Sequence, residues 1–402
     1  MPDPTVLRAG LVDAVLRATG PIGPPIVEAL RTVPRHLFLP EVPVEDAYRD
    51  DAIVTKRDPR GRPISSSSQP TIMALMLDQL APAPGHRVLE IGAGTGYNAA
   101  LLAHLVRPGG RVVSVDIDAD LVERAAAGLA RTGYPEAAVV RGDGGLGVPE
   151  RAPYDRVIAT VGVWDLAPAW LAQIAPGGRL VAPLDLGGIQ CSVAFERCGE
   201  HWRSRSVVPC GFMRLRGAFA GPERTLVLDP EAQLAVMLPG GGAAEPAALR
   251  GMLAAPPVVR LPAPATGASD MFGGLGLWLG ARERRYCQFS EGGATGPILP
   301  SAPAQLRDLR MTVGLFDRDG VALLGAEPHG ATVAFGYGAG GGRLAGDLVG
   351  HIRAWEAAGR PGVAGLRIDA YPRAAPPPPP DGATVIEKAH TRLLLSWPVS
   401  RP

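Results

Sequence analysis

The chain has 402 residues, of which 46% are hydrophobic and 20% charged, and its formal net charge is +1. This composition is typical of a soluble protein with a sizeable core, and the length allows two or three domains. The near-zero net charge gives no indication of a nucleic-acid or membrane partner. The sequence shows no apolar leader and no apolar run that could span a bilayer, so we expect a cytoplasmic protein.

The first 80 residues are predicted to be mainly helical. Apolar side chains recur on one face over residues 6–17, and a second helix is expected at Pro24–Thr32. A segment punctuated by prolines follows and contains the motif PRHLFLP. Residues 61–70, GRPISSSSQP, are predicted to form a polar loop that leads into the helix TIMALMLDQL. Ser68 or Gln69 could cap that helix.

The stretch Arg87 to Tyr97, RVLEIGAGTGY, joins a strand pattern to a helix pattern. A short apolar run precedes the glycines and an amphipathic segment follows them, so strand, turn and helix are expected in that order. This is the first unit of a doubly wound nucleotide-binding fold, in which the ligand lies at the carboxyl end of the strand. Gly92, Gly94 and Gly96 lack Cβ atoms and would let the backbone approach a ligand closely.

The details of this loop indicate which nucleotide it binds. The third glycine comes one residue earlier than in the dinucleotide motif G-x-G-x-x-G, and Tyr97 stands where a nicotinamide enzyme has glycine. Glu90 precedes the loop. Asp116 ends the next predicted strand, where it would accept hydrogen bonds from two ribose hydroxyls. The combination favours S-adenosylmethionine; another nucleotide or a purely structural turn are the alternatives.

Strand and helix patterns continue to alternate, with strands expected at residues 111–116, 138–141 and 154–160 and in RLVAPL. The alternation predicts a parallel sheet with right-handed crossovers, an α/β doubly wound Rossmann-like domain. Asp143 follows the third of these strands, where it is suited to accept from an adenine amino group. An antiparallel hairpin over residues 189–209 should close the sheet, so we place the first domain at residues 1–218.

Residues 219–402 are predicted to form a smaller α+β domain. The stretch MTVGLFDRDGVALLG has two apolar runs around Asp319-Gly320, a strong hairpin signal. A strand (ATVAFGYG), a helix (344–358) and two further strands (LRIDAYP and TRLLLSW) should follow. The glycines at 336–342 are interpreted as a helix-entry turn. This region contains no motif that we can connect to catalysis, so we expect it to select the substrate.

Several motifs in residues 1–217 together resemble the protein L-isoaspartyl/D-aspartyl O-methyltransferase family. They occur in the order and spacing of that family: PRHLFLP, SQPTIMALML, VLEIGAGTGYNAALLA, GDGGLG, APYDRVIAT and LAQIAPGGRLVAPL. The resemblance implies a carboxyl O-methyltransferase that uses S-adenosylmethionine, releases S-adenosylhomocysteine and needs no metal. The active-site serine of the family falls on Ser68. The resemblance and the motif together assign cofactor binding to Glu90, Gly92, Ala93, Gly94, Thr95, Gly96, Tyr97, Asp116, Ile117, Asp143 and Gly144, and substrate binding to Ser67, Ser68, Gln69 and Val161.

Shorter motifs point to a sub-group. The run ISSSSQP, the turn TVGVWD and the extra C-terminal domain are similar to the FxLD-type methyltransferases of lanthipeptide maturation. The chain departs from the wider family at Thr71, where His or Tyr is frequent, and in its polyserine run. We therefore expect an enzyme that methylates an aspartate of a modified, macrocyclic precursor peptide and so leads to succinimide or isoaspartate.

Two other functions stay open on the sequence alone. General repair of isoaspartyl residues in proteins uses the same chemistry and needs only the first domain. A binding protein with an inactive methyltransferase fold is the third possibility, although the intact glycines, Asp116 and Asp143 argue against it. The size of the second domain favours the peptide-tailoring hypothesis.

Overall fold

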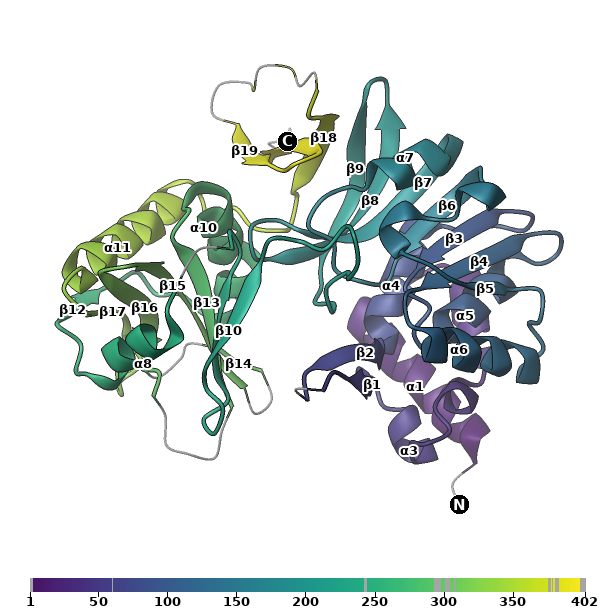
Figure 1. Cartoon of the computed structure of the whole chain (residues 1–402), viewed down its shortest axis with the longest axis horizontal. Helices are drawn as coiled ribbons and strands as arrows, with labels where there is room; N and C mark the ends of the chain where they lie inside the picture. Colours follow the sequence, from purple (N-terminus) through teal and green to yellow (C-terminus); the bar gives the residue numbers. More distant parts are fainter. Residues whose placement is uncertain are drawn as a thin grey trace.

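The computed structural model describes residues 3–59, 61–241, 244–292, 298–300, 304–306, 309–374, 377, 379 and 383–397. The chain forms two bodies that lie side by side in Figure 1, with the N-terminal half coloured purple to teal and most of the rest coloured green. Both predicted N-terminal helices are confirmed, as α1 (Pro4–Thr19) and α2 (Pro24–Thr32). A 3-10 turn (Arg35–Phe38) and the short α3 (Val44–Ala47) follow them.

The serine run does not form the predicted loop. Residues Pro63–Ser67 form β2, which pairs antiparallel with β1 (Ile53–Arg57), so that Ile53 lies opposite Ser67. The strand forms because β1 supplies backbone partners that no local pattern shows, while the small serine side chains alternate between buried and half-buried positions. The expected cap is also wrong: α4 (Pro70–Leu80) begins after Gln69, whose side chain makes no capping hydrogen bond.

The predicted doubly wound sheet is confirmed. Its five parallel strands lie in the order β5-β4-β3-β6-β7, and α5 (Tyr97–Val106), α6 (Ala119–Arg131) and α7 (Pro168–Gln173) connect them. The strand order reverses between β3 and β6, which is where ligands bind in such sheets. The strands are β3 (Arg87–Ile91), β4 (Arg111–Asp116), β5 (Ala138–Arg141), β6 (Tyr154–Ala159) and β7 (Ile174–Asp185).

The sheet continues beyond β7 with antiparallel strands. The predicted hairpin is confirmed as β8 (Gln190–Cys198) and β9 (His201–Pro209). Three strands from the end of the chain then join β9, in the order β18-β20-β19. These are β18 (Arg367–Pro372), β19 (Thr384–Glu387) and β20 (Thr391–Ser396), drawn in yellow beside β9 in Figure 1. The sequence pattern assigns these strands to the second domain, whereas they complete the first sheet.

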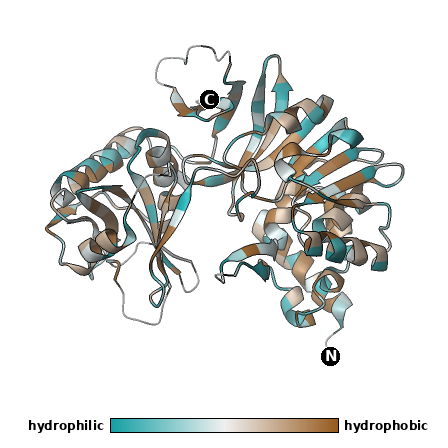
Figure 2. Ribbon diagram, viewed as in Figure 1, coloured by the Kyte–Doolittle hydropathy of each residue, from teal (hydrophilic) through white to brown (hydrophobic). Residues whose placement is uncertain are grey.

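Apolar side chains fill both faces of this ten-stranded sheet. On one face α1, α2, α4 and α5 pack together. On the other face Trp170 of α7 shares a core with Ile368, Leu393 and Leu395 of the C-terminal strands. Figure 2 shows the corresponding concentration of hydrophobic residues on the central strands. The C-terminal strands are therefore part of the hydrophobic core around the N-terminal sheet.

The second body is built on an antiparallel sheet, in the order β10-β11-β13-β15-β16-β17-β12, with β14 paired to β15. The predicted hairpin at Asp319-Gly320 is confirmed between β15 and β16. The strands are β10 (Arg224–Asp229), β11 (Leu234–Leu238), β12 (Val259–Pro262), β13 (Tyr286–Glu291), β14 (Ala304–Leu306), β15 (Leu309–Asp317), β16 (Gly320–Ala326) and β17 (Thr332–Tyr337). The helices are α8 (Pro246–Ala254), α9 (Ala268–Asp270), α10 (Gly276–Arg282) and α11 (Gly341–Ala357), with a π-helical turn at Met271–Leu275.

The second sheet carries α11 on one face and α8 on the other. The predicted helix after the glycine turn is confirmed as α11, so this part of the chain is α+β as expected. Within the described residues, none of the helices combines the length and apolar character that a membrane span requires.

Candidate active site

One cavity of about 380 Å³ lies at the carboxyl ends of the parallel strands, beside the reversal of strand order. Three segments surround it: the glycine loop after β3, the serine strand β2 with the start of α4, and the chain after β9. Of the predicted site residues, those that line the cavity are Ser67, Ser68, Gln69, Glu90, Gly92, Ala93, Gly94, Thr95, Tyr97, Asp116, Ile117, Gly144 and Val161. Tertiary structure thus brings all of the predicted cofactor and acceptor residues except Gly96 and Asp143 to one cavity.

The glycine loop requires glycine at each of its three positions. Gly92, Gly94 and Gly96 have φ angles of 98°, 52° and 86°, which are strained for residues with a Cβ atom. A Cβ atom on Gly92 would lie 2.9 Å from the Thr160 hydroxyl, and one on Gly96 would lie 3.0 Å from Ala125 of α6. Gly96 therefore serves helix packing and does not line the cavity, whereas Gly94 faces it.

The Asp116 carboxylate is arranged as a ribose acceptor would be. Its Oδ2 accepts from the backbone N–H of Gly94 at 3.0 Å, and its Oδ1 accepts from the N–H of Asp118 at 3.2 Å. Each oxygen keeps a lone pair for another donor, and the side chain borders the cavity. The two neighbouring hydroxyl groups of a ribose could each donate a hydrogen bond to one of these oxygens. The residues present therefore fit S-adenosylmethionine.

Glu90 lies underneath the loop and is completely buried. Its carboxyl group accepts from the Ser114 hydroxyl at 2.5 Å and from the Asn98 amide at 2.8 Å. Burial raises the pKa of Glu90 to about 7. Glu90 thus ties β3 to β4 and to the first turn of α5, and it contributes a wall of the cavity.

Asp143 lies at the predicted rim but outside the cavity lining. Its oxygens accept from the backbone N–H groups of Gly145 at 2.9 Å and Ala218 at 2.6 Å. Gly217 and Ala218 lie against it, and the next residue, Phe219, packs on Gly145 and stacks on His390 with ring centroids 5.4 Å apart. Contact of Asp143 with an adenine amino group stays a prediction, because in this structure both oxygens already hold the chain together.

The acceptor side of the cavity is built from hydroxyl groups. Ser67 is buried, whereas Ser68 is half-buried and its hydroxyl has no hydrogen-bond partner among the described residues. Val161 lies across the cavity, directly after Thr160, whose hydroxyl donates to the Gly92 carbonyl at 2.7 Å. The Ser68 hydroxyl is therefore available to a ligand. Its predicted catalytic role is chemically possible but stays a prediction.

Sequence reasoning missed the segment after β9. Residues 209–216 line the cavity and are held to the strand end by Gly162, whose N–H donates to the Met213 carbonyl at 2.8 Å. The same segment carries Arg216, which pairs with Asp118 at 2.7 Å. No local pattern signals this contact, because the two residues lie 98 positions apart.

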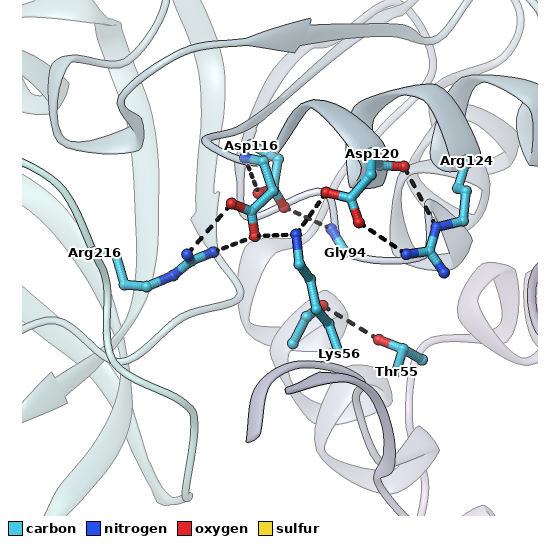
Figure 3. A network of polar contacts seen from close by, with 9 residues as sticks. Thr55, Lys56, Gly94, Asp116, Asp120, Arg124 and Arg216 are labelled. Carbon is cyan, nitrogen blue, oxygen red and sulfur yellow. Dashed lines mark hydrogen bonds and ion pairs between the residues drawn. The ribbon is translucent and has the colours of Figure 1, made fainter. Parts of the chain in front are cut away.

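A second cation pairs with the same carboxylate oxygen of Asp118. Lys56 of β1 lies 3.0 Å from Asp118 and 2.5 Å from Asp120, at the start of α6 (Figure 3). Arg216 and Lys56 together lower the pKa of Asp118. The hairpin β1–β2 and the segment after β9 are thereby joined at the edge of the cavity, beside Asp116.

The parts of the chain that the structure describes hold no group of three or more His, Cys, Asp or Glu side chains placed to bind a metal ion. Two histidines of the first body have ordinary structural partners: His36 contacts the Tyr48 hydroxyl at 2.8 Å, and His104 of α5 contacts that of Tyr134 at 3.0 Å. Neither residue lines the cavity.

Comparison with known proteins agrees with this geometry. The family model for protein-L-isoaspartate(D-aspartate) O-methyltransferase matches residues 11–218. The chain is 43% identical over 202 residues to the protein-L-isoaspartate O-methyltransferase of Methanopyrus kandleri, covering 49% of this chain and 87% of that protein. It is 38% identical over 211 residues to that of Herpetosiphon aurantiacus, covering 52% and 90%.

One solved structure titled protein-L-isoaspartate O-methyltransferase resembles both bodies of the fold. It covers 90% of this chain and 96% of its own, at 24% identity and a TM-score of 0.51. The family match spans the five parallel strands, the β8–β9 hairpin, the glycine loop and the serine segment, and these include the residues that line the cavity. The chain therefore belongs to the protein-L-isoaspartate(D-aspartate) O-methyltransferase family, and it is an S-adenosylmethionine-dependent carboxyl O-methyltransferase.

Proposed function

We propose that this enzyme methylates the free α-carboxylate of L-isoaspartyl residues in damaged proteins. One observation carries the proposal: the glycine loop with Asp116 and the serine segment with Ser68 line a single cavity, so a bound methyl donor and an acceptor carboxylate would meet there. The names of the sequence relatives support this acceptor.

The chemistry needs little from the protein beyond positioning. A carboxyl group with a pKa near 4 is already an anion at neutral pH, so no general base is required. When bound, S-adenosylmethionine supplies an electrophilic methyl group on a sulfonium centre. Asp116 and the glycine loop would hold the donor, while the Ser68 hydroxyl would donate to the acceptor carboxylate and orient it. Alignment and exclusion of water then account for the acceleration.

The product explains how methylation leads to repair. Methoxide is a better leaving group than the oxygen of a free carboxylate. The neighbouring backbone amide nitrogen can therefore displace methanol and close a succinimide. Hydrolysis of the succinimide gives aspartyl or isoaspartyl linkages, and repeated cycles deplete the isoaspartyl form. These later steps require no further residue of the enzyme.

Peptide tailoring, the function that the sequence pattern favours, has less support. The size of the second body was the main reason to favour tailoring. However, a solved structure named protein-L-isoaspartate O-methyltransferase resembles the fold over 90% of this chain. The second body therefore does not discriminate between repair and tailoring. The polyserine strand and Thr71 are the remaining observations that favour a lanthipeptide-type substrate.

A direct comparison of acceptors tests the proposal. Three peptides are offered with labelled S-adenosylmethionine: one with an internal isoaspartyl residue, the same sequence with aspartyl, and a macrocyclic thioether peptide with aspartate in its ring. We expect methylation of the isoaspartyl peptide and at least a hundredfold preference over its aspartyl twin. Turnover of the macrocyclic peptide alone would overturn repair in favour of tailoring. Absence of cofactor binding in calorimetry would identify an inactive fold.

A further inference from the structure

Arg35 is a fully buried arginine that joins the proline-rich segment to the acceptor strand. It comes from the motif PRHLFLP, and its guanidinium is completely inaccessible to solvent. Nη1 donates to the carbonyls of Ala47 at 3.0 Å and Arg49 at 2.9 Å, and Nη2 donates to that of Asp51 at 3.0 Å. One side chain thus fixes three alternate carbonyls of residues 47–51.

The same guanidinium reaches the predicted catalytic serine. Nη2 also donates to the Ser68 carbonyl at 3.1 Å and lies 3.4 Å from the Ser67 hydroxyl. Its carbon lies 6.0 Å from the ring centroid of Tyr97, the first residue after the glycine loop. Arg35 therefore lies between the serine segment and Tyr97, and both of these line the cavity. A planar, multidentate donor group is required for this pattern, and lysine cannot reproduce it.

Asp50 completes the arrangement from within residues 47–51. Its Oδ1 accepts from the backbone N–H of Thr71 at 2.8 Å, and its Oδ2 accepts from the Thr71 hydroxyl at 2.7 Å and the Gln69 amide at 3.1 Å. A carboxylate at the first turn of a helix satisfies free N–H groups and complements the helix dipole. Asp50 thus caps α4, the role that neither Ser68 nor Gln69 fills.

We propose that Arg35 and Asp50 are positioning residues for the acceptor, forming a bracket that holds Ser68-Gln69-Pro70 in place. Arg35 fixes the backbone at Ser68, and Asp50 fixes the two residues on either side of Pro70. Within Ser68-Gln69-Pro70, the Ser68 hydroxyl has no partner among the described residues and borders the cavity. This inference rests on the proposed function for its kinetic consequence, whereas its structural part does not depend on the substrate.

The bracket makes a prediction that differs from a purely structural role. If it positions the acceptor, its loss should lower the rate of methyl transfer per folded molecule while cofactor affinity stays the same. Asp50→Asn is the principal variant because it keeps the shape and removes the charge. Thr71→Val removes one hydrogen bond to Asp50, the one from the Thr71 hydroxyl. Asp46→Asn is the matched control, since Asp46 lies just before residues 47–51 and its exposed carboxylate pairs with Arg49 at 3.8 Å, away from Thr71 and Gln69.

Steady-state kinetics with the isoaspartyl peptide give the first readout. We expect Asp50→Asn to lower kcat/KM at least tenfold, mainly through kcat, and Thr71→Val to lower it about threefold. The Kd for S-adenosylhomocysteine should change by less than twofold. Arg35→Lys should show a larger loss if it folds. Retention of kcat/KM within twofold in Asp50→Asn, or a loss matched by cofactor affinity, would show a structural role only and overturn the proposal.

Amide hydrogen exchange of the cofactor-free protein gives the second readout. Exchange over residues 66–72 should accelerate at least fivefold in Asp50→Asn, with no change in residues 92–97 and none in Asp46→Asn. Unchanged exchange at 66–72 refutes the bracket whatever the substrate is. A wild-type protein that methylates no isoaspartyl peptide refutes the proposed function instead, and the exchange result then decides on the bracket by itself.

Discussion

The Asp165 carboxylate accepts a hydrogen bond of 2.6 Å from the backbone N–H of His390, which lies 225 residues further along the chain. Its other oxygen accepts from the Thr391 hydroxyl at 2.5 Å, and the side chain is completely buried. Asp165 thus secures the turn between β19 and β20 against the strand ends that carry the active site. Phe219, beside Asp143, stacks on His390 of the same turn.

We expect Asp165→Ala to destabilise the protein by about 2–4 kcal/mol, because it leaves the buried Thr391 hydroxyl and the part-buried N–H of His390 without this acceptor. Urea denaturation followed by far-ultraviolet circular dichroism measures the change. Thr391→Val, which keeps the backbone hydrogen bond, should lose less. An unchanged denaturation midpoint in Asp165→Ala would mean that the C-terminal strands do not contribute to the stability of the first sheet.

Asp116→Ala should weaken the binding of S-adenosylhomocysteine at least tenfold. The substitution removes an acceptor for two ribose hydroxyls, each worth about 1.5–3 kcal/mol with a charged partner. Isothermal titration calorimetry gives the affinity. Glu123→Gln serves as the control, since Glu123 is an exposed residue of the neighbouring helix α6 and does not line the cavity. Equal affinities in Asp116→Ala and the wild type would place the cofactor elsewhere.

Ser68→Ala should reduce kcat for the isoaspartyl peptide by about one to two orders of magnitude. The Ser68 hydroxyl has no structural partner in the described part of the chain, so the melting temperature and the cofactor Kd should not change. Ser68→Thr, which restores a hydroxyl, should recover part of the rate. Full activity of the alanine variant would remove Ser68 from the catalytic machinery.

Glu90 should make stability depend on pH near neutrality. Burial raises its pKa from 4.5 to about 7 in the folded protein. The folded state binds the Glu90 proton more tightly than the unfolded state does. The stabilisation by protonated Glu90 is therefore complete below pH 4.5 and is lost as the pH rises through 7. Relative to Glu90→Gln, the wild type should lose up to ~3 kcal/mol of unfolding free energy between these limits. Parallel pH profiles of the two proteins would contradict this.

Lys56→Met should accelerate the release of S-adenosylhomocysteine. Lys56 and Arg216 join two walls of the cavity through Asp118, and partly exposed ion pairs of this kind contribute about 0.2–1 kcal/mol. We therefore expect a two- to fivefold higher dissociation rate by rapid mixing, and a similar effect of high salt on the wild type. Arg124→Met is the control because Arg124 pairs with Asp120 within one helix. Equal dissociation rates in Lys56→Met and the wild type, with no effect of salt, would show that these ion pairs do not hold the cofactor in place.

Local sequence patterns were enough to predict the nucleotide-binding unit and the strands around it. The strand, the glycine turn and the helix around Gly94 were predictable because each depends on residues a few positions apart: apolar periodicity for β3 and α5, and positive φ angles that favour glycine. The parallel strands, the β8–β9 hairpin and the hairpin at Asp319-Gly320 followed for the same reason. Motif resemblance assigned Ser68 to the active site, and in the structure Ser68 and Gly94 line the same cavity.

Features that depend on distant partners could not be predicted from local patterns and follow from the three-dimensional packing. The serine run became a strand because β1 pairs with it, and α4 is capped by Asp50 from a segment that lies 21 positions earlier. The strands at 367–396 joined β9 because their apolar faces complete the core around Trp170. Local patterns report only the propensity of a segment, whereas its partners are chosen by burial and hydrogen bonding across the whole fold, which no short window of sequence contains.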